Sequence, residues 1–570
     1  MDANALTERG DQLFTKRGSL ASLWQEIADQ CYVERADFTT SRSLGSDFAS
    51  HLTTSYPMML RRDLGNSFSA MLRSTAIDWF SMRADREEYE DQPAKEWLEA
   101  STGVMRRAMY DRRSLFTRAT KEGDHDFAAF GQAVLSVELN GAADGLLYRC
   151  WHLRDVAWCE SSEGKIDTVH RKWKPTVAML CKLFKNVHPK VTEKLSGTSP
   201  KPYDEINVRH IVMPAEEYGL MATRYGATRY NGEGGRFAHN WGQIGEEKSR
   251  LPFVSIYLDV DNKHIMEAVG QTYFMYVIPR WQTVSGSQYA FSPATVAALP
   301  DARLLQDMSR VLLEAGEKAT NPPMIAVQEA IRSDIGIFAG GITWVDREYD
   351  EKLGEVLRPL TQDMRGIPMG IDMAQDIKAM LREAFFLNTL TLPQNGPEMT
   401  AYEVGQRIQE YIRQASPIFE PMEDEYNGAL CETTFELMLR NGAFGPMQDI
   451  PQSLRGQEIR FRFESPLHEA IERQKGQKFQ EVKAILADTL ALDETITADV
   501  DIREAFRDVI TSIGAPAKWL RSETEADDIR GEDEQAQEAA ALLQTMGAGA
   551  QVAEQMGKAQ QALGPEVLAA

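Results

Sequence analysis

The stretch LPDARLLQDMSRVLLEAGEKATNPP, residues 299–323, opens the part of the chain that decides the fold. Its apolar residues recur at helical spacing until a pair of prolines ends the pattern, so we expect an amphipathic helix here. A Gly-rich, strand-like piece, GIFAGGITWV (336–345), follows, and IDMAQDIKAMLREAFFLN (371–388) then repeats the helical pattern. This order predicts two helices around a small β-containing module, placed as an excursion inside a larger body.

Each of the two expected helices carries one apolar stripe. In the first helix the stripe is formed by Leu305, Met308, Leu312 and Ala315. In the second helix it follows positions i, i+4, i+8 and i+12 through Met373, Ile377, Leu381 and Phe385. A single stripe predicts that each helix packs on a neighbouring helix while its other face stays polar.

A turn-prone loop and a long helical pattern follow the second helix. The loop TLTLPQNGPE (389–398) contains two prolines and a glycine, which is typical of an exposed connection. Thr400 and Glu403 have the spacing of a capping box and predict where the next helix begins. Two prolines predict a bend near Ser416, and Gly442, preceded by an asparagine, predicts the end of the helix.

Composition bounds the class of protein. The chain has 570 residues, 43% of them hydrophobic, which supports more than one domain with a large core. No run is long and apolar enough for a membrane span, and residues 1–19 lack the apolar core of a signal peptide. The formal net charge of −23 disfavours a protein that grips nucleic acid tightly, but it suits one that lets nucleic acid slide past. The few, scattered cysteines indicate reduced thiols: Cys31, Cys150, Cys159, Cys181 and Cys431.

The rest of the chain predicts an α+β body rather than alternating βαβ units. Strand patterns are found at 146–153, 156–161, 165–173, 208–214, 253–260, 275–281 and 458–464. We expect the last of these strands to return the chain to the β-rich body. Helical patterns are found at 13–35, 57–74, 93–119 and 176–186, and residues 122–138 change from helix to strand.

For no candidate set of catalytic or metal-binding residues does the sequence favour a functional role over a structural one. Asp124-His125-Asp126 fits a polar helix start better than a metal site, because no second ligand pair lies at metal-site spacing. The segment 259–264 is too short for a calcium loop. A zinc site would need a set of side chains on successive strands to converge at a spacing typical of no common zinc module: Cys150, His152, Cys159 and His170. We therefore expect no cofactor, no metal and no enzymatic activity.

Several short motifs, taken together in their order, resemble the portal proteins of short-tailed bacteriophages, also called head-to-tail connectors. They are Arg17-Gly18 with LWQEIA (23–28), PRW (279–281), GSQYAFSP (286–293), ALPD (298–301) and MTAYEV (399–404). Trp79-Phe80 and Phe130-Gly131 also occur in the expected order. Two motifs depart from the family pattern: Tyr402 replaces a threonine in one, and Ala290-Phe291 replaces Gly-Arg in the other. The resemblance spans about residues 10–520.

The resemblance implies the function. A portal is a homo-oligomeric ring, commonly a homododecamer, at one capsid vertex, and the genome enters and leaves through its axis. The implied partners are further copies of the chain, double-stranded DNA in the channel, the terminase large subunit, tail or adaptor proteins, and the major capsid and scaffolding proteins, with no membrane. The implied location is the virion, after synthesis in the cytoplasm of the bacterial host.

The resemblance also implies a partition of the chain. In portal terms the parts are a wing (1–296 and 400–466), two stem helices (297–320 and 368–388), a β-containing clip (321–367), a tunnel loop (389–399), a helical crown (467–525) and a C-terminal Ala/Gln-rich helix or disordered tail (526–570). The channel residues would be Leu390, Leu392, Pro393, Gln394, Asn395 and Gly396 of the tunnel loop. Three basic residues would face the channel, although a solvated helix face is the better explanation for any one of them taken singly: Lys318, Lys378 and Arg382.

Two other classes of function are compatible with the sequence. The first is an enzyme such as a nuclease or hydrolase, which a catalytic carboxylate cluster or metal-dependent activity would reveal. The second is a different structural virion protein, such as a tail adaptor or an internal head protein. Microscopy of the purified protein separates that class from a portal, because only a portal forms a ring with an axial hole.

Overall fold

The computed structural model describes the greater part of the chain. The described residues are 3–41, 49–73, 78–197, 199–218, 251–326, 357–359, 366–389, 413–414, 418, 421–446, 448–463, 479, 482–486, 501–512, 519 and 526–531. The chain divides into two compact units: Met1–Trp79 with Met105–Ala443, and Phe80–Val104 with Phe444–Ala570. Each unit is described by itself below. Among the described helices, none combines the length and the hydropathy that a membrane crossing requires.

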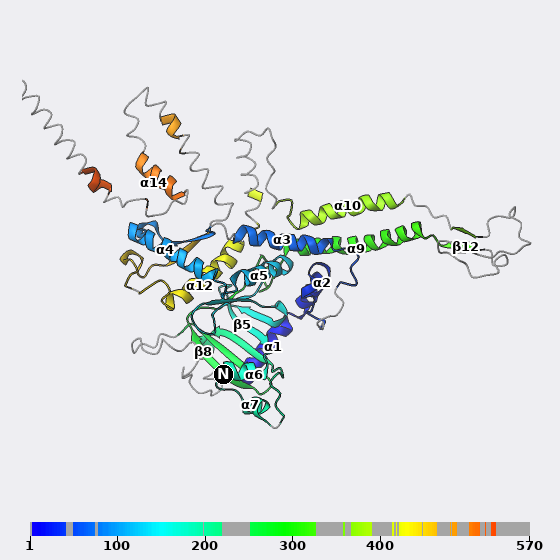
Figure 1. Cartoon of the computed structure of the whole chain (residues 1–570), viewed down its shortest axis with the longest axis horizontal. Helices are drawn as coiled ribbons and strands as arrows, with labels where there is room; N and C mark the ends of the chain where they lie inside the picture. The colour runs from blue at the N-terminus through cyan, green and yellow to red at the C-terminus, as the bar shows by residue number, and fades with distance from the viewer. Residues whose placement is uncertain are drawn as a thin grey trace, which may run out of the picture. The chain divides into compact units, whose positions relative to one another are not determined.

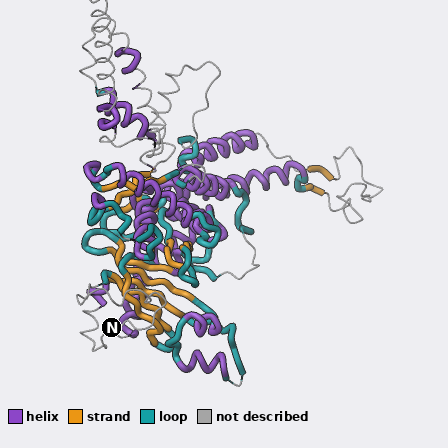
Figure 2. Tube along the Cα trace, turned by 60° about the vertical axis from the view of Figure 1, so that its left-hand side comes forward, coloured by secondary structure: helices purple, strands orange, loops and turns teal. Residues whose placement is uncertain are grey.

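A five-stranded antiparallel sheet forms the lower part of the first unit (Figures 1 and 2). Its strands lie in chain order: β4 (Val156–Glu160), β5 (Ile166–Trp173), β6 (Val208–Pro214), β7 (Phe253–Asp259) and β8 (His264–Gln271). Helix α1 (Ala3–Lys16) packs on the side chains of Ile211 and Met213. Helices α6 (Val177–Leu183) and α7 (Pro189–Ser196) share a core with Val208. Because successive side chains of β6 point to opposite faces of the sheet, these helices cover both faces.

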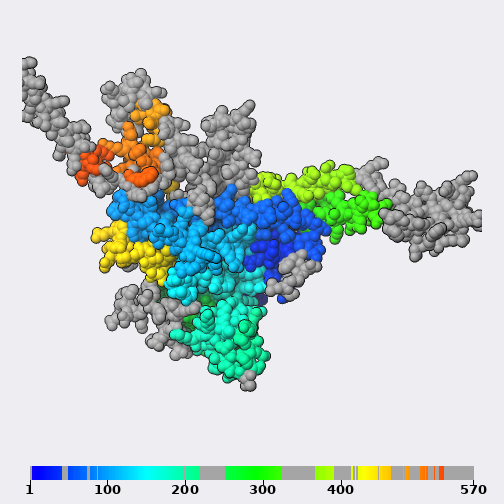
Figure 3. Space-filling model, in the orientation of Figure 1, coloured from blue at the N-terminus to red at the C-terminus, as the bar shows by residue number. Residues whose placement is uncertain are grey.

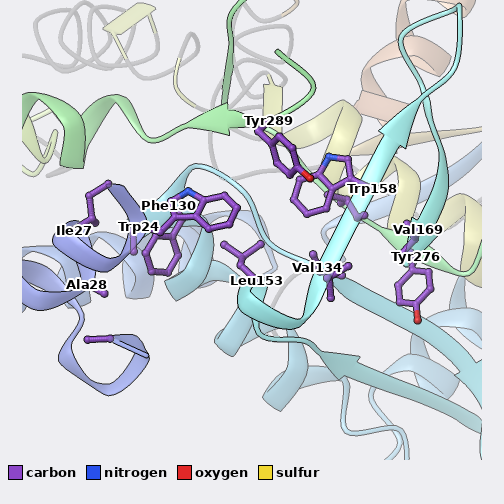
Figure 4. Close-up of a cluster of buried hydrophobic side chains, with 14 of the residues drawn as sticks. Trp24, Ile27, Ala28, Phe130, Val134, Leu153, Trp158, Val169, Tyr276 and Tyr289 are labelled. Atoms are coloured by element: carbon purple, nitrogen blue, oxygen red, sulfur yellow. The ribbon is translucent and has the colours of Figure 1, made fainter. Parts of the chain in front are cut away.

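A second layer joins three helices to a smaller sheet in the same unit. The sheet order is β3 (Leu146–Cys150), β2 (Leu135–Leu139), β9 (Tyr276–Val277), and all pairings are antiparallel. The helices are α2 (Gly18–Cys31), α3 (Tyr56–Leu72) and α5 (Phe116–Phe130). Figure 4 shows Trp24, Phe130, Trp158 and Tyr289 meeting in the core between them. Shorter elements of this unit are η1 (Val33–Arg35), η3 (Leu153–Asp155), β10 (Gln282–Thr283) and β11 (Ala290–Phe291).

The second unit is organised around one pair of strands. β1 (Phe80–Ala84) pairs antiparallel with β14 (Ile459–Phe463), and the rings of Phe80 and Phe461 lie 6.2 Å apart. The strand expected at 458–464 is therefore present. Its expected return to the β-rich body is wrong, because its partner is β1. The unit also holds η2 (Glu87–Tyr89), the first part of α4 (Gln92–Met109), η7 (Gln452–Leu454) and α14 (Ile502–Ser512).

Two of the expected helices are each divided in two. The pattern at 13–35 contains the end of α1 and all of α2, because the chain breaks at Arg17. The Arg17 guanidinium donates to the carbonyl of Leu153 at 2.6 Å and to that of Arg154, which holds the break in place. The pattern at 93–119 ends α4 at Met109 and begins α5 only at Phe116. These divisions depend on tertiary contacts and on local turn geometry, which helical periodicity does not report.

One buried histidine of the five-stranded sheet leads us to predict how stability depends on pH. His170 is fully buried, and neither of its ring nitrogens has a hydrogen-bond partner among the described residues. Burial, together with the nearby Arg209, lowers the pKa of His170 to about 3. The unfolded chain therefore takes up a proton near pH 6.5 that the folded chain refuses, so stability should fall by about 1.4 kcal/mol per pH unit as pH drops from 6.5 towards 3.

Urea unfolding midpoints measured from pH 7 to pH 4 test this prediction. Carboxylates that lose their ion pairs contribute to the same slope, so the informative quantity is the difference between the wild type and the His170→Leu variant. The variant should show a shallower fall over this range. Parallel curves for the two proteins would contradict the assignment to His170.

Candidate functional site

Two long helices of the first unit form an arm. Helix α9 (Pro293–Thr320) and helix α10 (Gly366–Ala384) lie side by side along much of their length (Figures 1 and 3). They approach closely at Gly370, where an added Cβ would lie 2.8 Å from a methyl carbon of Leu312. Both helices were expected from the sequence, although α9 begins before residue 297 and continues through Pro300.

The apolar stripe of α9 faces its neighbours as expected. Leu305 is buried, and Met308, Leu312 and Ala315 are partly buried. On α10 the expected stripe is wrong at its first position, because Met373 is 48% exposed and Ala374 is buried instead. A constant spacing of four residues drifts around a helix of 3.6 residues per turn, so the stripe must include a step of three.

The start of α9 is fastened to the end of α5 by side-chain hydrogen bonds. The Ser292 hydroxyl caps α9 by accepting from the amide of Thr295 at 3.4 Å, and it donates to the carbonyl of Ala128 at 2.8 Å. The Thr295 hydroxyl donates to the carbonyl of Ala129 at 2.7 Å. All of these groups are buried, so each hydrogen bond satisfies a polar group whose burial without a partner would be costly.

A glycine makes this junction possible. Gly131 ends α5 in the left-handed region at φ +71°, where an L side chain is strained. An added Cβ at this position would also overlap the backbone of Phe291 and Ser292, so the two chain segments touch here without any side chain between them. The Trp281 amide donates to the Gly131 carbonyl at 2.8 Å and adds a third segment to the junction.

A glutamine fastens α9 to the segment before α3. The Gln306 side-chain oxygen accepts from the amides of Thr53 at 2.8 Å and Thr54 at 3.0 Å, and its nitrogen donates to the Thr54 carbonyl at 2.9 Å. On α10, the carbonyl of Lys378 accepts from the Tyr56 hydroxyl at 3.3 Å. The inner half of the arm is therefore held by several independent contacts.

The outer half of the arm is different. The buried residues of α9 end at Gln306, and those of α10 begin only at Ala374. Between these points and the far end of the arm, both helices expose apolar side chains: Val311, Leu313, Met369, Ile371 and Met373. An arm with this much exposed apolar surface is typical of a protein that covers the surface in an assembly.

The far end of the arm is closed by a short pair of strands. β12 (Met324–Ala326) pairs antiparallel with β13 (Leu357–Pro359), so that Met324 is the partner of Pro359. The chain thus leaves the arm and returns to it at neighbouring points. The intervening residues 327–356, which contain the Gly-rich piece, lie outside the described part of the chain.

The three basic residues named from the sequence lie at different places on the arm. Lys318 is exposed in the last turn of α9. Arg382 is exposed near the end of α10 and donates to the Asn388 side chain at 3.1 Å. Lys378 is half-buried, and its ammonium lies 5.7 Å from the centre of the Tyr56 ring. Whether any of them faces a channel remains a prediction.

The loop residues expected to line a channel lie outside the described part of the chain, as do the capping box and the bend expected near Ser416. The expected end of the long helix is confirmed. Helix α12 (Ala429–Arg440) ends with Gly442 at φ +70°, and the Ala443 amide donates to the Met438 carbonyl at 3.0 Å. A π-helical segment, Glu423–Gly428, precedes α12 and has no signal in the sequence.

Asp124, His125 and Asp126 lie inside α5, so the expected polar helix start is wrong. Asp124 and Asp126 are buried, and each carboxylate pairs with an arginine: Asp124 with Arg73, and Asp126 with Arg35 at 3.1 Å. Burial, helped by neighbouring arginines and a lysine, lowers the pKa of His125 to about 4. The three residues hold α5 to its neighbours rather than forming one polar centre.

The four residues considered for zinc also have separate surroundings. Cys150 Sγ lies 3.8 Å from an Asp126 oxygen, and His152 Nε2 lies 2.6 Å from an Asp37 oxygen. Cys159 approaches its neighbour's carbonyl, and His170 is buried against α1. Within the described ranges no group of three His, Cys, Asp or Glu side chains is placed to hold a metal ion.

Some of the motif residues meet inside the first unit. Trp158 and Gln288 exchange two hydrogen bonds, at 3.1 and 2.7 Å, and Tyr289 packs between Trp158 and Trp24. Arg280 donates to Glu425 of the π-helical segment at 2.9 Å and also pairs with Glu160. These residues are therefore structural. The sequence alone did not single out Gln306, the clamp that fastens the arm.

Comparison with known proteins gives four matches. A family model described as bacteriophage head to tail connecting protein matches residues 3–520. A "Probable portal protein" of Bordetella phage BPP-1 is 25% identical over 472 residues, which cover 82% of this chain and 79% of the relative. The "Portal protein" of Salmonella phage epsilon15 is 22% identical over 472 residues, which cover 80% and 78%. A chain of a "Virion of native gene transfer agent (GTA) particle" aligns with a TM-score of 0.34 and 9% identity over 77% of this chain and 89% of that chain.

Proposed function

Because the chain belongs to the family of bacteriophage head-to-tail connecting proteins, we propose that it assembles into the portal ring through which the phage genome is packaged and ejected. Membership of this family makes it a structural component of the virion, located where head and tail are joined. The ring, with twelve copies, and the DNA channel along its axis are the finer parts of the proposal.

The arm of α9 and α10 is the observation that supports a ring. Its inner half is fastened inside the chain, although Val296, Leu304 and Met380 are exposed there. Among the described residues of α9 and α10, the outer half has no buried side chain and exposes further apolar side chains. Identical neighbours on both sides would cover them, and a head-to-tail contact that closes on itself produces a ring. The net charge of −23 per copy supports passage of DNA without tight binding.

We assign the parts of the chain accordingly. The wing comprises 1–296 and 400–466, the stem 297–320 and 368–388, and the clip 321–367. The tunnel loop is 389–399, the crown is 467–525, and the tail is 526–570. The pairing of β12 with β13 supports a clip that begins and ends at the tip of the stem, where the terminase large subunit and then the tail adaptor would dock. Capsid and scaffolding proteins would contact the wing.

Native mass measurement tests the ring. At micromolar concentration and in more than one salt condition, the purified protein should have the mass of a closed homo-oligomer, and axial views in negative-stain microscopy should show a central hole. A monomer under all conditions would contradict the proposal. A closed ring of another subunit number would keep the portal and correct only the number of copies.

Shortening the tunnel loop tests the channel. The segment 389–398 has one charge, Glu398, so we expect it to obstruct DNA sterically and to hold packaged DNA against slippage rather than to bind phosphate. Replacing 391–397 by two glycines should leave the ring intact and lower the fraction of DNA-filled heads after packaging. If the filled fractions are equal, the loop is only a connection between helices.

A further inference from the structure

The turn between α4 and α5 carries an unusual density of positive charge. Residues 104–121 contain six basic residues and one acidic residue, in a chain with a net charge of −23. Most of these basic side chains are exposed, and so is one from β3. We call this set the arginine patch: Arg107, Arg112, Arg113, Arg118, Lys121 and Arg149. A local patch of this kind attracts an acidic partner although the whole chain is acidic.

Much of this charge is not neutralised by the residues that the structure describes. Arg113 pairs with Asp111 and Asp144, and Arg118 pairs with Glu122. No ion pair with a described residue is made by the other members of the patch: Arg107, Arg112, Lys121 and Arg149. Exposed ion pairs are weak, so an incoming carboxylate can also compete for the paired arginines.

A small pocket lies within the patch. It has a volume of about 250 Å³, and its lining combines the apolar surfaces of Leu115, Tyr148 and Trp151 with Arg118 and Arg149 and with Glu122, which pairs with Arg118. Pockets for small-molecule ligands usually measure roughly 300–1,000 Å³, so this one suits a single side chain. An apolar anchor with carboxylates beside it fits such a surface, because arginine clusters recognise acidic motifs.

The apolar part of the pocket is held open by the backbone. Leu115 is 42% exposed and has the left-handed φ of +56°, a conformation that disfavours leucine. Ser114 keeps it there: its hydroxyl donates to the Asp111 carbonyl at 2.7 Å, and its carbonyl accepts from the Tyr148 amide at 2.8 Å. An exposed leucine fixed in this way offers apolar surface to a partner instead of packing in the core.

We propose that the arginine patch is the docking site for the acidic segment 523–534 of a second copy of the chain, with Ile529 entering the pocket. This segment, ETEADDIRGEDE, has seven acidic residues, one arginine and a single branched aliphatic side chain. Ile529 is 38% exposed on the helical residues 526–531, and both Asp527 and Asp528 are exposed. The segment lies beyond residues 3–520, the part of the chain that the family model matches. This docking proposal depends on the proposed ring for one reason only: it requires neighbouring copies of the chain.

Photo-crosslinking of the full-length chain tests the contact. Copies with Ile529→p-benzoylphenylalanine are mixed with isotope-labelled copies before assembly and then irradiated. Mass spectrometry should find crosslinks from position 529 to peptides covering 112–121 or 146–151, each joining a labelled to an unlabelled copy. Crosslinks confined to single copies, or to other surfaces, would overturn the proposal.

Charge reversal provides the second arm of the experiment. The double variant Arg118→Glu and Arg149→Glu should reduce the crosslinks at least about tenfold, a loss typical of removing charge complementarity. The matched variant Lys185→Glu and Lys190→Glu changes the same charge on two exposed lysines, one just after α6 and one in the first turn of α7, and should leave the yield unchanged. Equal yields from both variants would overturn the proposal.

Two further measurements separate the competing explanations. Native mass is measured on the same samples: rings without the expected crosslinks overturn this inference but leave the proposed function standing, whereas the absence of rings contradicts the proposed function itself. Binding of a short fluorescent DNA duplex is measured by anisotropy. DNA binding that the patch variant loses, with no crosslink to the patch, would assign the patch to DNA and overturn docking by the acidic segment.

Discussion

Replacing Gly131 by alanine is expected to destabilise the first unit by about 4 kcal/mol or more, which is at the extreme for a single substitution. Two costs coincide at this position. The backbone has the left-handed φ of +71°, and the new Cβ would overlap the backbone of Phe291 and Ser292. The overlap cannot be relieved by a rotamer change, because the atoms in the way belong to the main chain that starts α9.

Gly164→Ala is the matched control for Gly131→Ala. Gly164 has a similar φ of +79°, but no atom lies within 4 Å of the position of an added Cβ. This variant therefore carries the conformational cost alone, about 1–2 kcal/mol. Urea unfolding followed by tryptophan fluorescence measures both variants. Similar losses would show that the segments at Gly131 can move apart, which would contradict the close junction of α5 and α9.

Removing the Asp124 carboxylate is expected to cost about 3–5 kcal/mol, because it leaves a buried guanidinium without its counter-charge. Arg73 and Asp124 have side chains that are 2% and 0% exposed. Arg73 also donates to the Asn427 side chain at 2.6 Å, and its guanidinium lies 4.3 Å from the centre of the Tyr426 ring. The pair thus joins α5 to the π-helical segment, and Asp124→Ala should loosen both.

A double variant distinguishes charge from packing. Arg73→Met with Asp124→Leu removes both charges and keeps most of the volume, so it should be more stable than Asp124→Ala alone. The control is Asp307→Ala, which breaks the exposed pair with Arg310 at 3.1 Å and should change stability by less than about 1 kcal/mol. All three are compared by unfolding midpoints at neutral pH. A double variant as unstable as Asp124→Ala would mean that lost packing, not the unpaired charge, causes the damage.

Periodicity in the sequence predicted the helices of the arm and most strands of the five-stranded sheet. Alternation is clear in β6, where Ile211 and Met213 face one layer and Val208 the other. It failed for β8, His264–Gln271, whose side chains are mostly half-buried at the edge of the sheet. An edge strand with partial burial on both faces does not need to alternate, so its sequence carries no signal of period two.

Contacts between segments far apart in the chain could not be predicted. Nothing in residues 458–464 indicates that their partner is β1 rather than the larger sheet. Gln306, on a helix with a polar face, has no feature that separates it from any surface glutamine until Thr53 and Thr54 are placed against it. Gly131 was recognised from the sequence only as part of the Phe130-Gly131 motif. Its role in admitting Phe291 still required the structure.

The pairing of β12 with β13 also has a practical consequence for protein engineering. Met324 and Pro359 are direct partners, so the two ends of whatever lies between them are a strand spacing apart, roughly 5 Å. The cost of closing a loop depends on the distance between its ends and only weakly on its length. Foreign inserts with adjacent termini, such as an affinity tag or the corresponding module of another connector, can therefore be grafted there without stretching α9 or α10. The partner recognition that we propose for the tip could in this way be exchanged independently of the helices that carry it.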